Sequence, residues 1–271
     1  MASLTKIMTL LLSYHLLQKY GESPEILTFT VNKVAACING THSGLREGDQ
    51  VTVLDLFYGL MLPSGNDCAL ALAYGFGNLI VKRKKKKAID GTPISPMKEF
   101  IKEMNKLAIK LSLKNTHYVN PHGLSEKGNR STAADLGKLA SVAIQIPLIE
   151  KIVSTKCYST FVTDIRGNQR KLEWHNTNKL LDKGFSGIKT GTTPNAGPCL
   201  SSLLRSGNEG VIVTLLNCKT LDHRWSEAEK LAQWALNNIC SMKEKLESLS
   251  SGTNPPFKIS TRIIAGLCKQ H

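Results

Sequence analysis

Apolar residues recur at helical spacing in the first twenty positions of the chain and predict a helix over residues 3–19. Gly21 and Pro24 are typical of its end. The apolar positions that share one face are Leu4, Ile7, Met8, Leu11, Leu12 and Leu16. The same spacing predicts an amphipathic helix over residues 98–113.

Other segments alternate between helical and strand-like patterns. Apolar runs predict helices over residues 53–61, 68–77 and 221–239, and Thr132 with Asp135 resembles a capping box at the start of one more. Strands are predicted within residues 25–53, in a hairpin over 156–174 about residues 164–167, and at 187–190, 199–205 and 210–218. A helix-rich middle between sheet-forming ends indicates an α+β fold with its site in the cleft between the two parts.

The composition is that of an ordinary globular protein. The 271 residues are 41% hydrophobic and 21% charged, so a core of useful size forms without disulfides or a metal ion. We expect one domain over residues 1–242 and a polar tail over 243–271 that contains no recognisable domain. No signal peptide or stretch of transmembrane length is visible, so this chain does not itself support membrane association, and its localisation is left unknown.

The formal net charge is +14, which indicates an anionic partner such as a polymer, a lipid surface, nucleic acid or an acidic substrate. Part of this excess is local, because residues 82–87 are all Lys or Arg. The simplest interpretation of this block is a solvated surface loop. We expect no nucleic-acid partner.

Cysteine and histidine patterns argue against a metal enzyme. The seven cysteines are scattered, and no pair has the C-x-x-C spacing of a zinc site. His117 and His122 are not part of an H-E-x-x-H motif, so we expect structural roles for them. We predict no metal and no cofactor.

Ser3 and Lys6 form an S-x-x-K motif at the start of the first predicted helix. The i, i+3 spacing places both side chains on one helical face, and a serine hydroxyl becomes nucleophilic when a neighbour removes its proton. The positive end of the helix dipole favours developing negative charge on Ser3. Lys6 accepts a proton only if burial or a nearby cation lowers its pKa.

Two further motifs supply the remaining groups. Ser64-Gly65-Asn66 places a hydroxyl and an amide on a tight loop, where Ser64 can relay a proton to a leaving amine and Asn66 can hold Lys6 or the substrate amide. Lys189-Thr190-Gly191 lies on a predicted strand, where Lys189 can bind a substrate carboxylate. The N–H groups of Ser3 and Thr192 are candidates for an oxyanion hole. Each motif alone is common by chance, but the three in this order are specific.

With surrounding blocks included, residues 2–240 resemble the serine D-Ala-D-Ala carboxypeptidases, the low-molecular-mass penicillin-binding proteins of peptidase family S11. These blocks are 2–9, 62–67, 115–117, 120–124, 131–136, 176–181, 187–193 and 196–197. The resemblance implies a penicillin-binding protein/serine β-lactamase-like (transpeptidase-like) fold, with an antiparallel sheet, a helical subdomain and the active site in the cleft between them. It also implies that an acyl-enzyme forms on Ser3.

The resemblance further implies the partners and the roles of the residues. The substrate would be a peptidoglycan stem peptide ending in D-Ala-D-Ala, and β-lactams would be covalent inhibitors. Ser3, Lys6, Ser64 and Asn66 would be catalytic; Lys189, Thr190, Gly191 and Thr192 would bind substrate. The family's usual address is periplasmic or extracellular.

The chain departs from the family pattern at its start, where only Met1 and Ala2 precede the nucleophile, so we expect that the family's N-terminal strands are missing. Two alternatives therefore stay open. One is an inactive homologue that binds muropeptide or an anionic polymer. The other is a β-lactamase-like hydrolase, although no Glu stands in a recognisable position to activate a deacylating water.

Overall fold

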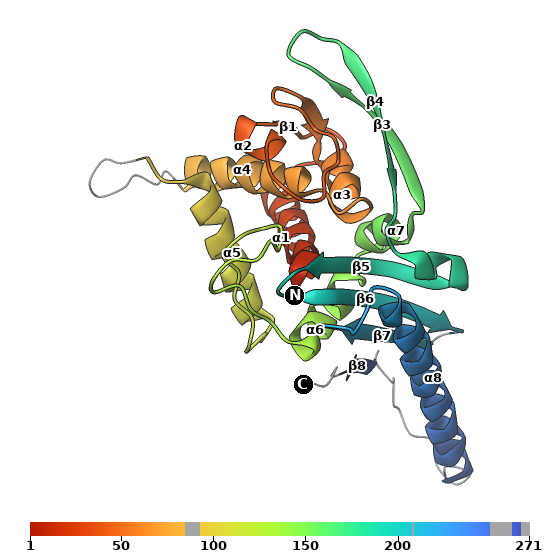
Figure 1. Cartoon of the computed structure of the whole chain (residues 1–271). Coiled ribbons are helices and arrows are strands. Elements are labelled where there is room, and N and C mark those ends of the chain that lie inside the picture. The colour runs from red at the N-terminus through yellow and green to blue at the C-terminus, as the bar shows by residue number, and fades with distance from the viewer. Residues whose placement is uncertain (85–92, 208, 250–261, 267–271) are drawn as a thin grey trace.

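A computed structural model describes residues 1–84, 93–207, 209–249 and 262–266 of the chain. Helices form one part of the molecule, and a sheet with its covering helices forms the other (Figure 1). The first long helix, α1 (Thr5–Tyr20), lies where the two parts meet. This arrangement is the predicted α+β fold.

The larger sheet has the strand order β5-β6-β7-β8. β5 (Phe185–Thr193), β6 (Gly197–Ser206) and β7 (Glu209–Leu215) are antiparallel neighbours, and β8 (Arg262–Gly266) pairs in parallel with β7. Alternate residues of β6 and β7 enter two different hydrophobic clusters, as the two faces of a strand require. Leu200 and Val211 pack with the helix α8 (His223–Leu249), whereas Ile212 belongs to the main core around α1.

The helical part surrounds α1 with α3 (Val53–Met61), α4 (Asn66–Arg83) and α5 (Pro96–Lys110). α1 is buried on its polar side as well as its apolar side, because Lys6, Thr9 and Ser13 are all fully buried. A helix buried all round fits a position between the sheet and the other helices. The first 3-10 turn, η1 (Ala2–Leu4), leads into it from the edge of β5.

A second sheet has the order β1-β2-β3-β4. β1 (Thr28–Thr30) and β2 (Gln50–Thr52) are short, and the helix α2 (Lys33–Ala36) follows β1. β3 (Cys157–Thr163) and β4 (Gln169–His175) form the predicted hairpin, which projects from the body in Figure 1. Arg170 of the hairpin pairs with the buried Asp49 at 2.6 Å.

The remaining elements connect these parts. They are α6 (Ala133–Ala143), α7 (Pro147–Ser154) and the 3-10 helix η2 (Lys179–Lys183). The Thr132 side chain accepts a hydrogen bond from the Asp135 N–H, so the predicted start of α6 is confirmed.

The C-terminal segment differs from the prediction. The last helix was expected to end at residue 239, but α8 continues to Leu249, so the expected domain boundary at 242 falls inside it. The segment expected to be a tail also contributes β8. Residues 243–249 hold only two apolar residues, Leu246 and Leu249, which continue the helical spacing of Ile239 and Met242, and the rest are polar or charged. The polar composition of this segment outweighed that spacing in the prediction, although most of its residues are good helix formers. Residues 250–261 and 267–271 lie outside the described residues.

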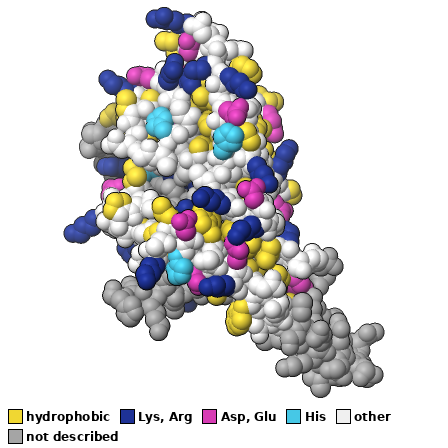
Figure 2. All heavy atoms as spheres, turned by 45° about the vertical axis from the view of Figure 1, so that its right-hand side comes forward, with side chains coloured by type: hydrophobic (Ala, Val, Ile, Leu, Met, Phe, Trp, Pro, Cys, Tyr) yellow, Lys and Arg dark blue, Asp and Glu magenta, His cyan; other side chains and the backbone are white. Residues whose placement is uncertain are grey.

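The basic block lies partly at the end of α4. Its described residues form surface ion pairs, in which Arg83 contacts Glu22 at 3.0 Å and Lys84 contacts Glu103 at 2.6 Å. Residues 85–87 of the block lie outside the described residues. Figure 2 shows Lys and Arg spread over one face of the molecule with Asp and Glu among them, as expected for solvated surface charge.

Candidate active site

Ser3 and Lys6 face each other across one helical turn. Ser3 is half-buried in η1, Lys6 is fully buried in α1, and the Lys6 Nζ donates to the Ser3 Oγ at 3.0 Å. The contact predicted from the S-x-x-K spacing is therefore confirmed. A hydroxyl at the beginning of a helix also lies near the positive end of its dipole.

Lys6 is held by acceptors from two distant segments. Its Nζ donates to the Asn66 Oδ1 at 2.7 Å and to the carbonyl oxygen of His122 at 2.8 Å. Burial lowers the Lys6 pKa well below its ordinary value, and the charge of Lys189 lowers it further. Both causes favour the neutral amine, which is the form that accepts a proton.

The Ser64-Gly65-Asn66 segment forms a tight turn at the start of α4. Ser64 has a positive φ of 69°, and a Cβ on Gly65 would lie 1.9 Å from the Ser43 Oγ, so this position excludes larger residues. The Asn66 Nδ2 donates to the carbonyl of Asn39 at 2.8 Å, which orients its Oδ1 toward Lys6. The buried Ser64 Oγ has no hydrogen-bond partner among the described residues.

The strand β5 carries the Lys189-Thr190-Gly191 motif. Lys189 is 1% exposed, and its Nζ has no hydrogen-bond partner in the described part of the chain. Burial, with the charge of Arg224, lowers its pKa to about 7. The Thr190 Oγ1 lies 2.7 Å from the Thr177 Oγ1. A buried ammonium without a partner is costly, and a bound carboxylate would relieve that cost.

Gly191 lets β5 approach Ser3, the candidate nucleophile. A Cβ at this position would lie 2.9 Å from the Ser3 backbone N and 3.1 Å from Leu4 Cδ1. Thr192 follows at an exposed position, with its Oγ1 donating to the Gly191 carbonyl at 2.7 Å. The three predicted motifs therefore meet at one place, with Ser3 beside β5 and Lys6 beside Asn66.

Sequence reasoning missed Arg224 of α8. Its Nη1 lies 3.4 Å from the carbonyl oxygens of Gly191 and Cys199 and from the Thr192 Oγ1. Its charge also acts on Lys189. No short motif includes a residue that far along the chain, so the sequence carried no local signal for this contact.

A loop that the motif analysis left without a role, residues 120–124, also belongs to the site. The carbonyl of His122 holds Lys6, and a Cβ on Gly123 would lie 2.0 Å from the carbonyl oxygen of Ala2. The block was recognisable, but no pattern marked a backbone carbonyl as a ligand of Lys6.

His122 itself is structural in its side chain. Its Nδ1 accepts a hydrogen bond from the Leu124 N–H at 3.2 Å, and burial together with the Lys6 charge lowers its pKa to about 4. The imidazole is therefore neutral near pH 7 and adds no positive charge beside Lys6.

A cavity of about 380 Å³ opens beside Ala2, the residue that precedes Ser3. It is lined by Met1 and Ala2, by the loop 123–127, and by Thr193 and Asn195 near the end of β5. Glu126 and Lys127 supply one charge of each sign to its wall. A cavity of this size beside the turn η1 has room for part of a peptide.

The family model for D-alanyl-D-alanine carboxypeptidases, peptidase family S11, matches residues 1–80 and 93–220. The chain belongs to this family. The gap in the match, residues 81–92, contains the whole Lys-rich block, residues 82–87.

Several relatives of this D-alanyl-D-alanine carboxypeptidase family member are known. The D-alanyl-D-alanine carboxypeptidase of Streptomyces sp. strain K15 is 38% identical over 192 residues, which is 69% of this chain and 62% of the relative. DacF of Bacillus subtilis is 33% identical over 239 residues, or 87% of this chain and 56% of the relative. The chain thus spans about three fifths of the curated relatives that it matches.

Solved structures agree with the family fold. The crystal structure of the Streptomyces K15 DD-transpeptidase has a TM-score of 0.76 and 34% identity, and the similarity covers 87% of each chain. DacD of Francisella tularensis has a TM-score of 0.73 at 25% identity. The predicted penicillin-binding-protein fold is confirmed.

Within the described ranges no helix is both long and apolar enough to cross a membrane. The cysteines whose side chains the structure describes are thiols outside any disulfide: Cys37, Cys68, Cys157, Cys199 and Cys218. Trp174 and Trp225 pack in the core, whereas Trp234 is 58% exposed on α8.

Proposed function

We propose that this chain is a serine-type D-Ala-D-Ala carboxypeptidase that removes the terminal D-alanine of peptidoglycan stem peptides and binds penicillins. The observation that carries the proposal is the position of the Lys6 Nζ, 3.0 Å from the Ser3 Oγ and 2.7 Å from the Asn66 Oδ1. An amine with a lowered pKa beside a hydroxyl is the pairing that nucleophilic catalysis without histidine needs.

Acylation begins when neutral Lys6 takes the proton of the Ser3 hydroxyl. The Ser3 Oγ then attacks the carbonyl carbon of the penultimate D-alanine. The negative charge that develops on the carbonyl oxygen is stabilised by the N–H groups of Ser3 and Thr192, which the close approach of Gly191 to Ser3 supports. Asn66 and the His122 carbonyl hold Lys6 during this transfer.

Collapse of the tetrahedral intermediate breaks the peptide bond. The leaving D-alanine nitrogen takes a proton that Lys6 passes through the Ser64 hydroxyl, whose Oγ has no hydrogen-bond partner in the described structure. Lys189 binds the terminal carboxylate of the substrate, and Thr190 and Thr192 flank it on the same strand. Water then attacks the Ser3 ester, with Lys6 as the base, and the shortened peptide leaves.

The β-lactam reaction uses the same groups. The Ser3 Oγ attacks the lactam carbonyl, the ring C–N bond breaks, and the acyl group stays on Ser3 with its carboxylate at Lys189. The lactam nitrogen remains attached to the acyl group, so no fragment departs and the adduct persists wherever water reaches the ester slowly.

The test is release of D-alanine from a peptide ending in D-Ala-D-Ala. We expect release by the wild-type chain, no release by Ser3→Ala, and unchanged release by Ser13→Ala. Ser13 is the matched control because it is a buried serine of α1, the helix that follows the Ser3 turn, and its hydroxyl has no hydrogen-bond partner in the described residues. Peptide binding without D-alanine release by the wild-type chain would instead indicate the inactive binding homologue.

A further inference from the structure

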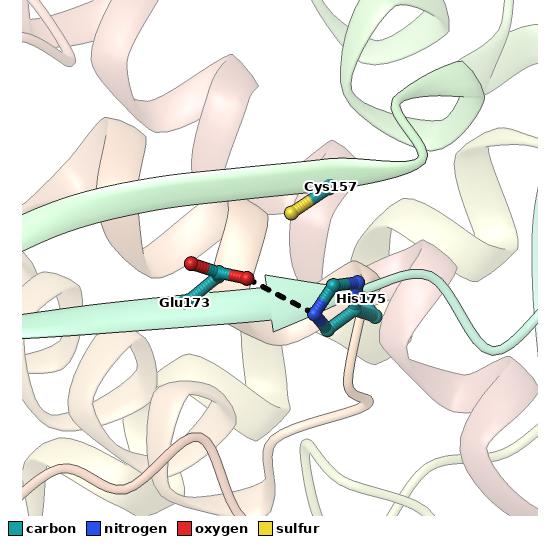
Figure 3. Close-up of side chains that lie close together, drawn as sticks. All are labelled: Cys157, Glu173 and His175. Atoms are coloured by element: carbon teal, nitrogen blue, oxygen red, sulfur yellow. Dashed lines mark ion pairs between the residues drawn. The ribbon is translucent and has the colours of Figure 1, made fainter.

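The hairpin β3–β4 brings together three side chains that no short sequence motif connects. Cys157 lies directly opposite His175 in the strand register, and Glu173 precedes His175 by two residues on the same face of β4. Figure 3 shows Cys157 on one strand and Glu173 with His175 on the other. In an antiparallel pair, opposite and diagonal neighbours on one face are within contact distance.

The donor atoms of this group are close to the spacing that a metal ion requires. The Cys157 Sγ, a Glu173 carboxylate oxygen and a ring nitrogen of His175 all lie within 4.8 Å of one another, and the Glu173 Oε1 is 3.2 Å from the His175 Nε2. A tetrahedral zinc ion with bonds of 2.0–2.3 Å separates its ligand atoms by about 3.5 Å. Because all three side chains are exposed, rotation about their side-chain bonds brings the sulfur into that range without moving the strands.

We propose that Cys157, Glu173 and His175 form a zinc site that fastens the base of the hairpin. A thiolate, an imidazole and a carboxylate are the ligand types that zinc uses, whereas magnesium and calcium prefer oxygen ligands alone. On binding, the Cys157 thiol loses its proton to solvent as the Zn–S bond forms, and the imidazole binds in its neutral form. Three protein ligands leave the fourth position to water.

Groups around Glu173 act on a bound cation in opposite directions: the Lys171 ammonium repels it, whereas the Glu173 carboxylate attracts it. Lys171 lies 3.7 Å from the Glu173 Oε2, and the Ser159 hydroxyl donates to the same oxygen at 3.4 Å. The Glu173 Oε1 faces His175, so one carboxylate oxygen is available to the ion while the other keeps its contacts. The thiolate and the carboxylate together neutralise the two charges of Zn²⁺.

The position of the group gives the site a structural consequence. β4 ends at His175, and the next residues tie the hairpin to the catalytic cleft: the Thr177 N–H donates to the carbonyl of Leu62, and the Thr177 Oγ1 contacts Thr190. An ion at the base of the hairpin therefore braces the segment that touches both β5 and the loop before Ser64. We expect zinc to stabilise the folded chain without taking part in the reaction.

The sequence patterns used above could not reveal this group. Motifs such as C-x-x-C and H-E-x-x-H contain ligands that are only a few residues apart along the chain. We expected no metal because the sequence contains neither motif. Here 16 residues separate Cys157 from Glu173, and it is the pairing of β3 with β4 that removes this separation.

The test is calorimetric titration of Zn²⁺ into the reduced, chelator-treated full chain. We expect one ion per chain bound with micromolar affinity, and binding weakened at least tenfold in both Cys157→Ser and His175→Gln. The matched controls are Cys37→Ser and His223→Gln, which remove an exposed cysteine and an exposed histidine elsewhere and should leave the titration unchanged.

Two further readouts make the result decisive. A hundredfold excess of Zn²⁺ over its dissociation constant should raise the melting temperature by about 5 °C, and Cys157→Ser should lose this shift. Co²⁺ should give a thiolate-to-metal absorption band that Cys157→Ser lacks. Absence of saturable binding at millimolar Zn²⁺, or equal binding by wild type and Cys157→Ser, would overturn the proposal whether or not the chain releases D-alanine.

Discussion

Lys6 and Lys189 carry like charges into one buried site, and the proposed chemistry needs them in opposite protonation states. Lys6 accepts a proton only when neutral, whereas Lys189 binds a carboxylate only when charged. Burial lowers the pKa of both, and each has a second cation nearby: Lys189 for Lys6, and Arg224 for Lys189. Activity should therefore be greatest at pH values above the pKa of Lys6 and below the pKa of Lys189, where Lys6 is neutral and Lys189 is charged.

Arg224→Gln should move the alkaline limb of the pH profile. The charge of Arg224 helps to lower the Lys189 pKa to about 7, so its removal raises that pKa and keeps Lys189 charged to higher pH. The measurement is the pH dependence of kcat/KM for D-alanine release. Arg224→Lys, which keeps the charge, is the control. An alkaline limb that stays in place in Arg224→Gln would contradict the assignment of that limb to Lys189.

Lys189→Met should stabilise the fold while it removes carboxylate binding. The Lys189 ammonium is buried and has no partner in the described structure, and replacing buried ions by apolar groups of similar size commonly gains about 1–4 kcal/mol. The folded-state pKa of about 7 lies below the unfolded-state value near 10.4, so the unfolded chain binds more protons between these values.

The buried charge of Lys189 therefore lowers the free energy of unfolding of the wild-type chain most below pH 7. This destabilisation decreases as the pH rises toward 10.4. Thermal unfolding of both chains at several pH values measures the difference. If the gain in stability of Lys189→Met over the wild-type chain increased with pH, the lowered pKa of Lys189 would be contradicted.

Individual residues of the site were predictable where the contact is local. The Ser3–Lys6 contact follows from helical spacing, and the tight turn at Gly65 follows from the residue types around it. The contacts of Arg224 and of the His122 carbonyl join segments more than 30 and more than 100 residues apart, respectively. Such contacts depend on packing that no local pattern encodes.

At the scale of elements, the site depends on how closely β5 approaches η1. Gly191 permits that approach, because a Cβ there would lie 2.9 Å from the Ser3 backbone N. A backbone atom cannot rotate away as the end of a flexible side chain can. The strand and the turn would have to separate, and the oxyanion donors would separate with them.

Gly191→Ala should therefore reduce acylation by a β-lactam at least tenfold, a loss in the range seen when an oxyanion-hole donor is misplaced. Gly210→Ala on the neighbouring strand β7 is the matched control, because its Cβ would meet Leu203 at an ordinary 3.4 Å. Acylation rates under second-order conditions compare the two. Equal rates in Gly191→Ala and Gly210→Ala would show that the close approach is unimportant.

The predictable elements were those with a clear period and clear ends. The β3–β4 hairpin and the start of α6 at Thr132 are present where the sequence indicated. The last ten residues of α8 were missed because most of them are polar or charged, and β8 was missed because it is a five-residue strand that gains its hydrogen bonds from β7. Strand pairing is a property of the partner as much as of the segment itself.

At the scale of the whole molecule, the α+β architecture was predictable because helical and strand patterns occupy different stretches of the chain. The way in which the parts meet was not. α1 is buried on its polar side because Lys6 and Thr9 contact the loop 120–124, while η1 lies against β5. The catalytic groups thus come from the helical part and from the sheet, and only the assembled fold brings them together.

Whether Ser3 is the nucleophile is decided by the mass of the intact chain after incubation with benzylpenicillin, followed by peptide mapping of the adduct. We expect the chain to gain the mass of one whole penicillin molecule, located on Ser3, and Ser3→Ala to gain none. An unmodified wild-type chain, or an adduct on any other residue, would contradict this role of Ser3.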